Sequence, residues 1–340
     1  MNISGIIKKI KTTVDNHNLD EEGKYARWLW QNERGTRDLG LDEYGCADAA
    51  NILYTIGEFP SEPEKRAKWI ETLQSFQDPE TGLFKDVENI HHPFHTTAQC
   101  AGALELFDAK VKYPLTAMFK YKDKEELYKF LDDLNWAGSP AMQSHQGAGL
   151  FAAMVLTKSV SYEWVCDYID WLWDNVDPVT GLWRKGCIDD EKLSVHYHIV
   201  GSFHYLFCCE HYHRPIRYPE RVIDTCIELY REKRLGDKGV DSDFFGRYIR
   251  YIEMDWTYML NRASRQTAHR FNEVKECLRE FSKGYIEFLS GIDEKTDDGF
   301  NDLHRLFGTV CALAELQQAL PGELETEKPL KLVLDRRPFI

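Results

Sequence analysis

The sequence predicts an all-α domain of the (α/α)₆ toroid class, in which six helical hairpins close into a ring of six inner and six outer helices. Apolar residues recur at helical spacing throughout, and no alternating β run of useful length interrupts them. The helical segments also alternate between two kinds, one amphipathic and one apolar on nearly every side. Segments of the second kind begin at steps of about 50 residues, a period typical of repeat architectures.

The amphipathic segments are the expected outer helices, because each must turn its charged side to water. They cover residues 21–32, 63–76, 124–134, 162–175, 219–234 and 272–289. The apolar segments are the expected inner helices, since a helix that is apolar all round has to be buried on every side. They cover residues 44–57, 95–107, 145–157, 198–209, 255–267 and 304–317. Their Gly and Ala residues allow neighbouring helices to approach closely.

Length and composition fit one large domain. The chain has 340 residues, of which 43% are apolar and 13% aromatic, enough for a large packed interior. A single core seldom grows to this size, but in closed repeat architectures each unit adds its own share of core. We therefore expect one domain over residues 1–340, in which residues 321–340 form a tail on the surface.

The net charge and the cysteine content limit which partners and which cellular compartment are expected. The net charge of -14 argues against binding to nucleic acid or to an anionic membrane. The nine cysteines include no CxxC pair and are expected to be reduced and buried, as in a cytoplasmic protein. The N-terminal stretch lacks the apolar core of a signal peptide, and no apolar run reaches membrane-spanning length. The sequence predicts a cytoplasmic protein and leaves its oligomeric state open.

Three turns repeat a pattern of Asp, Gly and often Pro followed by an aromatic residue, each after an expected outer helix. They are QDPETGLF (77–84), VDPVTGLW (176–183) and IDEKTDDGF (292–300). For any one copy, the simplest interpretation is a turn that ends a helix and lets the aromatic ring cap the core. The first two resemble the turns of the six-hairpin glycosidases, notably the unsaturated glucuronyl and rhamnogalacturonyl hydrolases. They resemble more faintly the turns of the squalene cyclase and protein prenyltransferase toroids.

The glycosidase resemblance implies the toroid fold and a carbohydrate substrate, and it maps no catalytic aspartate onto this chain. The cyclases and prenyltransferases are a more distant match, because the chain has neither a DxDD or DDxxD acid motif nor a counterpart of the prenyltransferase zinc set. The lanthionine cyclases also share the toroid, but their zinc-binding Cys and Cys-His motifs are missing here.

Polar residues gather where the expected inner helices begin. In the toroid the inner helices run parallel, so their first turns meet at one mouth, where helix N-termini favour anionic or hydroxyl-rich ligands. The residues are Asp42, Glu43, Tyr44, His91, His92, His95, His145, Gln146, His196, His198, Glu253, Asp255, Asp302 and His304. Asp42, Glu43 and Asp302 also suit helix caps and first turns. His204, in mid-helix, suits a hydrogen-bonded core position.

Candidate roles follow from side-chain chemistry. Asp255, or Glu253 if it still lies in the preceding loop, is the expected general acid or base, with His198 as a proton-transfer group and Tyr44 as the base of a lyase. The expected substrate-binding residues are His95, His145, Gln146, His196, His304, Trp256 and Arg262. Trp256 offers a ring face to a sugar. Arg262 offers a fork for a uronate carboxylate, although a surface salt bridge also explains such an arginine.

Three uses of this mouth stay open. The preferred one is a glycoside hydrolase acting on an oligosaccharide or another small hydroxylated substrate, with a polysaccharide lyase or sugar epimerase using His and Tyr as the closest alternative. Three imidazoles and a carboxylate are also ordinary metal ligands, but HxxxH and HxxE spacings are missing from the expected inner helices, so we expect no metal and no cofactor. The remaining alternatives are a toroid of the terpenoid cyclase or prenyltransferase kind and a non-catalytic binding scaffold.

Overall fold

The computed structural model describes residues 1–88, 90–187, 194–235 and 245–339. Over these residues the regular secondary structure is helical, with isolated β-bridges and no strand. The predicted all-α fold class is confirmed. Within the same residues, none of the helices combines the length and the apolar character that crossing a membrane requires.

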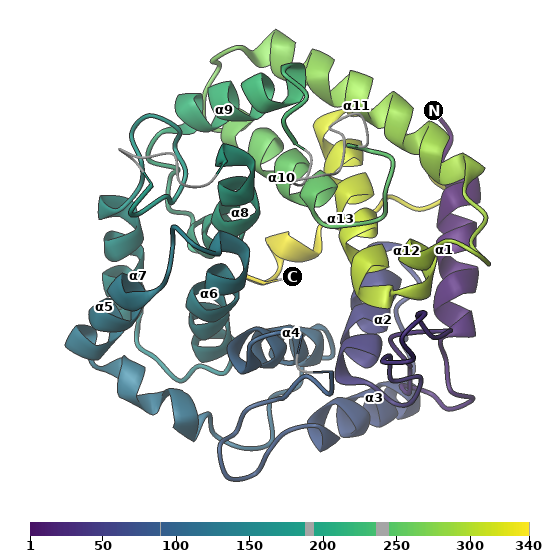
Figure 1. Cartoon of the computed structure of the whole chain (residues 1–340). Helices are drawn as coiled ribbons and strands as arrows, with labels where there is room; N and C mark the ends of the chain where they lie inside the picture. Colours follow the sequence, from purple (N-terminus) through teal and green to yellow (C-terminus); the bar gives the residue numbers. More distant parts are fainter. Residues whose placement is uncertain (89, 188–193, 236–244, 340) are drawn as a thin grey trace.

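Six helices form an inner layer. They are α2 (Glu43–Thr55), α4 (Pro93–Leu106), α6 (Pro140–Leu156), α8 (Val195–His211), α10 (Ile252–Ser264) and α13 (Leu303–Ala319). Each packs against the next in this order, and α13 packs against α2, so the layer closes into a ring (Figure 1). Helices α2, α4 and α13 bury residues on nearly every side, as the sequence predicts for inner helices.

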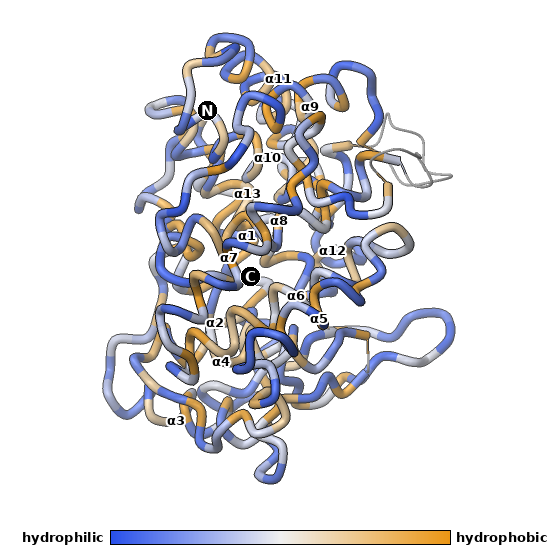
Figure 2. Tube along the Cα trace, turned by 90° about the vertical axis from the view of Figure 1, so that its left-hand side faces the viewer, coloured by the Kyte–Doolittle hydropathy of each residue, from blue (hydrophilic) through white to orange (hydrophobic). Residues whose placement is uncertain are grey.

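Further helices lie around this ring. They are α1 (Ser4–Asn16), α3 (Pro63–Ser75), α5 (Lys124–Asp133), α7 (Tyr162–Asp174), α9 (Pro219–Arg231) and α11 (Phe271–Gly291). A short α12 (Asp298–Asn301) and the 3₁₀ segments η1 (Thr116–Lys122) and η3 (Val333–Asp335) complete the helical elements of the described residues. Figure 2 shows hydrophilic residues gathered along the peripheral loops, which agrees with one face of each outer helix meeting water.

The first outer helix is not where the sequence analysis placed it. Residues 21–32 form turns and bends, and α1 takes the outer place beside α2 and α11 instead. Asp20 (φ 60°) and Gly23 (φ 84°) adopt left-handed backbone conformations, through which an α-helix cannot continue. Helix α1 is itself amphipathic, since Ile6 and Ile10 are spaced one helical turn apart and are both buried.

Glycines allow the inner helices to touch. A Cβ atom at Gly149 of α6 would lie 2.8 Å from the backbone of Phe94 in α4. A Cβ atom at Gly201 of α8 would lie 2.8 Å from the Pro140 side chain in α6. Neither approach leaves room for a larger residue, so these contacts depend on the missing side chain.

The repeated turns close hairpins and cap the core. Asp78 and Asp177 each accept a hydrogen bond from the backbone N–H two residues later, at 2.8 Å in both turns. Gly82 (φ 74°) and Gly181 (φ 75°) take the left-handed position that follows. The aromatic residues that end the two motifs are buried. This arrangement matches the simplest interpretation of the pattern, a helix-ending turn whose aromatic ring packs on the core.

The C-terminal tail enters the ring, so the expected surface position is wrong for its last described residues. Arg337 and Phe339 are fully buried, and in Figure 1 the trace ends in the middle of the ring. Arg336 pairs with Glu105 of α4 at 2.8 Å, which fixes the tail to the inner layer. Leu330, Val333, Leu334 and Phe339 of the tail are buried, and removing these apolar side chains from water stabilises the inserted position.

Buried apolar side chains form one connected core that spans both layers. The nine cysteines carry free thiols, and all except Cys166 are buried. Their burial agrees with the expectation from the sequence that they act as small apolar core residues.

Candidate functional site

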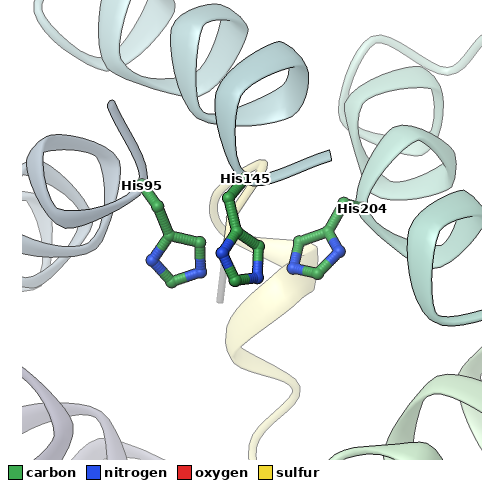
Figure 3. Close-up of side chains that lie close together, drawn as sticks. All are labelled: His95, His145 and His204. Atoms are coloured by element: carbon green, nitrogen blue, oxygen red, sulfur yellow. The ribbon is translucent and has the colours of Figure 1, made fainter. Parts of the chain in front are cut away.

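Five imidazole groups lie against one another at the end of the ring where α4 and α13 begin, which we call the histidine end. They belong to His91, His95, His145, His204 and His304, together named the histidine cluster. Ring centroids are 4.3 Å apart for His95 and His145 and 5.3 Å apart for His145 and His204. Figure 3 shows these three rings side by side, each reaching inward from a different helix.

Four helices and one loop supply the cluster. His95 and His304 lie in the first turns of α4 and α13, and His145 lies in the second turn of α6. His204 comes from the middle of α8, and His91 comes from the loop before α4. The structure thus brings together three predicted binding residues, His95, His145 and His304. It adds His204, which we expected to be a core residue, and His91, to which we gave no role.

Two of the imidazoles are held by buried carboxylates. Asp86 Oδ2 lies 2.8 Å from His91 Nδ1, and Asp48 Oδ2 lies 3.0 Å from His304 Nδ1. Burial opposes ionisation of Asp86, but the hydrogen bonds from His91 outweigh it, and the pKa of Asp86 falls to about 2. Because an ionised carboxylate only accepts, His91 Nδ1 carries the proton and Nε2 keeps its lone pair. An imidazole oriented in this way is suited to act as a general base.

Tyr44 lies in the middle of the cluster. Its hydroxyl is 2.7 Å from His95 Nδ1, and its ring centroid is 4.4 Å from that of His91 and 4.8 Å from that of His304. Burial raises the pKa of Tyr44 well above its ordinary value, so the phenol keeps its proton at neutral pH. Tyr44 therefore suits a proton donor better than the base that the sequence suggested.

Four of the five imidazoles, those of His91, His95, His145 and His204, favour the uncharged form near neutral pH. Burial lowers the pKa of His91 and of His204 to about 4. Burial also lowers the pKa of His95 and of His145 well below the ordinary value, and repulsion between neighbouring imidazolium groups adds to the effect. Neutral imidazoles have lone pairs that can accept protons or bind metal ions.

The predicted acid and base on α10 lie apart from the cluster. Because α10 begins at Ile252, Glu253 and Asp255 are both helical and point about 200° apart, so they cannot share a proton. Glu253 accepts hydrogen bonds from Gly246 N–H (3.0 Å) and Arg250 Nε (3.2 Å), and burial raises its pKa to about 7. Asp255 is buried without a hydrogen-bond partner among the described residues, and burial raises its pKa well above the ordinary range.

The first turn of α8 contributes no residue to the cluster. Helix α8 presents His204, nine residues into the helix, where the sequence analysis expected His196 and His198. His198 is buried near Arg184, and burial followed by that positive charge lowers its pKa to about 4. His196 Nδ1 lies 3.0 Å from the hydroxyl of Ser194. The proton-transfer role expected for His198 thus has no support from its surroundings.

Three predicted substrate-binding residues complete the comparison. Trp256 is fully buried and donates from Nε1 to the carbonyl of Cys226 in α9 (2.9 Å), so its ring offers no face to a sugar. Arg262 lies at the far end of α10 and forms a buried ion pair with Glu315 of α13 at 2.5 Å. Its guanidinium group is therefore not available to bind a uronate carboxylate, and its ion pair is not on the surface. Gln146 is half-buried beside His145 on α6.

Three members of the cluster meet a geometric requirement for holding a metal ion. His95, His145 and His204 each offer one nitrogen, and the three nitrogens lie within 4.8 Å of one another. The residues come from α4, α6 and α8, so no local spacing in the sequence marks them as a set.

No family model, curated protein or solved structure matches the chain. The resemblance to the six-hairpin glycosidases therefore stays a prediction. The case for a function rests on the residues of the histidine cluster and on their partners.

Proposed function

We propose that the chain is a carbohydrate-active enzyme that moves protons with His91, His304 and Tyr44, as a lyase or an epimerase does. The observation that carries this proposal is the pair of carboxylate-bound imidazoles, His91 with Asp86 and His304 with Asp48, whose ring centroids are 4.9 Å apart. The phenol of Tyr44 contacts both rings.

Lyases and epimerases need two proton-transfer groups around one substrate. One group removes a proton from a carbon next to a carboxylate or carbonyl, and the other delivers a proton to that carbon or to the leaving oxygen. His91 is the better base, because Asp86 fixes its Nδ1 proton and leaves Nε2 free to accept. Tyr44 is the candidate donor, and His304, whose Nδ1 faces Asp48, is a second candidate acceptor. His91 and His145 are the cluster members with partial exposure, so a substrate would approach past them.

Proton transfer at carbon has more support here than glycoside hydrolysis. Hydrolysis needs two carboxyl groups flanking the glycosidic bond. Near the cluster, however, Asp48 and Asp86 already accept hydrogen bonds from imidazoles, and Asp48 also accepts from the Gln99 amide at 2.5 Å. The expected carboxyl pair on α10 lies elsewhere. A carbohydrate is favoured as substrate by the glycosidase-like turns and by the match between imidazole, phenol and sugar hydroxyl groups.

A solvent-exchange experiment tests the proposal. The purified protein is incubated in D₂O with a panel of neutral and uronate-containing oligosaccharides, and NMR follows deuterium entering the sugar while ultraviolet absorbance follows unsaturated products. We expect deuterium entry without cleavage for an epimerase and unsaturated products for a lyase. The variants His91→Gln and Asp86→Asn should each lose at least about 100-fold in rate.

The matched control is His269→Gln. His269 pairs with Asp224 at 2.7 Å on the outer surface, so this variant breaks an Asp–His pair outside the ring. Its rate should equal that of the parent protein. Saturated sugar products without deuterium entry would instead support hydrolysis. Binding without turnover in the parent would support a scaffold, and undiminished turnover in His91→Gln would refute the assigned base.

A further inference from the structure

Three imidazoles of the histidine cluster converge from consecutive inner helices. The nitrogens that His95, His145 and His204 offer lie within 4.8 Å of one another, close enough to bind one ion after small side-chain rotations. In Figure 3 the three rings lie in a row with nitrogens directed toward the space between them. Their ring centroids are 4.3 Å apart for the first pair and 5.3 Å for the second.

The hydrogen bonds of His204 leave one of its nitrogens free to bind an ion. His204 Nδ1 lies 3.0 Å from the backbone carbonyl of Val200 and 3.1 Å from the Ser144 hydroxyl. A carbonyl only accepts, so Nδ1 carries the proton, and the lone pair of His204 is on Nε2. A ligating histidine typically donates its second N–H to a carbonyl or carboxylate, which fixes the tautomer and the ring orientation.

The other two imidazoles fit the same pattern. His95 Nδ1 lies 2.7 Å from the Tyr44 hydroxyl, whose own proton can go to Thr96 Oγ1 at 3.2 Å. With Nδ1 donating to the phenol oxygen, Nε2 of His95 keeps its lone pair for a ligand. His145 Nδ1 is buried and has no hydrogen-bond partner among the described residues. A buried polar atom without a partner is costly, and a bound cation would supply the missing interaction.

We infer that His95, His145 and His204 bind one divalent transition-metal ion, and that zinc is the best fit. Three imidazoles without a thiolate suit zinc, and protein sites with three such ligands leave a fourth position open for water or substrate. The ring of Phe339 packs at 4.8 Å from His95 and 6.2 Å from His204, so the tail covers one side of the three histidines. Burial, which keeps these imidazoles unprotonated, favours the form that binds metal.

Neighbouring carboxylates offset part of the added charge. Asp48 and Asp86 bind His304 and His91, whose ring centroids lie 6.1 Å and 5.0 Å from that of His95. They contact imidazoles next to the proposed ligands, so they can balance the ion without occupying its coordination sphere. This inference does not depend on the proposed function, because metal binding can be measured with no substrate present.

Metal titration tests the site directly. The protein, freed of any histidine tag, is stripped with a chelator, and zinc binding is then followed by calorimetry and cobalt binding by visible absorbance. We expect one ion per chain and the intense visible bands of four-coordinate cobalt. His145→Ala, at the partly exposed ligand, should weaken binding at least ten-fold, and His204→Gln should do the same.

The matched control is His198→Ala, which removes a buried imidazole from the same helix as His204 but outside the cluster. Circular dichroism verifies that each variant is folded. The inference is overturned if folded parent protein takes up neither ion, or if His198→Ala weakens binding as much as His145→Ala does. Metal binding without proton exchange would refute the proposed function alone, and proton exchange in a protein that binds no metal would refute this inference alone.

Discussion

The two ends of the inner ring differ in the polar groups that they bury. At the end where the tail docks, several buried charges meet opposite charges, although the guanidinium nitrogens of fully buried Arg337 have no hydrogen-bond partner among the described residues. Arg262 pairs with Glu315 and with Asp335 of the tail, each at 2.5 Å, and Arg336 pairs with Glu105. At the histidine end, five groups of the same kind face one another, and buried Nδ1 of His145 has no partner among the described residues.

This difference separates a structural role from a functional one. Pairing with opposite charge explains why Arg262 and Glu315 can be buried, because each compensates the lost solvation of the other. The crowding of His95, His145 and His204, which have no carboxylate partner among the described residues, has no such explanation, since each adds a desolvation cost and lowers its neighbours' affinity for protons. Groups that stability does not explain are the stronger candidates for chemistry.

The largest effect on stability is expected at the ion-pair end. Arg262→Ala leaves Glu315 buried without its main partner, and it should lower the free energy of unfolding by about 3–5 kcal/mol. Urea denaturation measures this. Arg265→Ala is the control, because Arg265 is partly exposed and approaches Glu315 only to 3.6 Å. It should cost less than about 1 kcal/mol. Equal losses of unfolding free energy in the two variants would show that the buried Arg262–Glu315 pair contributes no more to stability than an exposed contact.

Insertion of the tail is tested by Phe339→Ala. Phe339 is fully buried against His95, His204 and Phe207, so its truncation should cost about 3 kcal/mol in the same denaturation experiment. Val179→Ala, at a valine that is 70% exposed, should change stability by less than about 0.5 kcal/mol. If Phe339→Ala behaves like this control, the tail does not fill the ring in solution.

Substitution of Glu43 is expected to have a smaller effect on the free energy of unfolding, and one that depends on pH. Burial, followed by the neighbouring Asp42 and Asp86 carboxylates, raises the pKa of Glu43 to about 8, and its Oε1 accepts a hydrogen bond from Val87 N–H. Because the pKa of Glu43 is higher in the folded than in the unfolded protein, its contribution to the free energy of unfolding is full below about pH 4.5. That contribution is lost as the pH rises through about 8. The free energy of unfolding of Glu43→Gln should therefore rise relative to that of the parent protein by about 2 kcal/mol between about pH 5 and 6.5.

Chemical denaturation at a series of pH values measures that difference. The comparison is Glu43→Gln against the parent at each pH, since a neutral amide cannot ionise. A difference that stays constant, or that shrinks as the pH rises, would show that Glu43 is ionised in the folded protein and that its burial is tolerated by other means.

The smallest stability effect should come from the histidine end. In metal-free protein, His145→Leu replaces a crowded imidazole with an apolar group of similar size, so the free energy of unfolding should change by less than about 1 kcal/mol in either direction. Metal binding should be lost. A destabilisation as large as that of Arg262→Ala would make the cluster a structural element, and the contrast between the two ends would disappear.

Much of the helical pattern could be predicted from the sequence. The inner helices are apolar all round and recur at a regular step, so their existence and order follow from periodicity. The first outer helix was misplaced because the charged and aromatic residues between 21 and 32 imitate an amphipathic helix. The insertion of the tail depends on contacts such as Arg336 with Glu105, which lie 231 positions apart and have no local signature.

The candidate site was only partly predictable, because its residues also come from positions far apart in the sequence. His95, His145 and His304 could be grouped because each begins or nearly begins an inner helix. The place of His204 in the cluster was not predicted, because α8 starts earlier than expected and directs a mid-helix residue toward the cluster. The proposed metal ligands are separated by 50 and 59 positions, so the absence of HxxxH spacings from the expected inner helices carried no information about them. The partnership of Asp48 with His304 likewise spans 256 positions.

Closure of the ring also has a consequence for folding kinetics. Helix α13 packs on α2, Leu303 N–H donates to the carbonyl of Arg27, and Ile3 N–H donates to the carbonyl of Glu325, so segments about 300 positions apart must meet. Such non-local contacts slow folding, because the loop entropy is lost before the contact forms. Until closure, the apolar inner helices form an open arc with exposed edges, and that arc is the species from which aggregation should start.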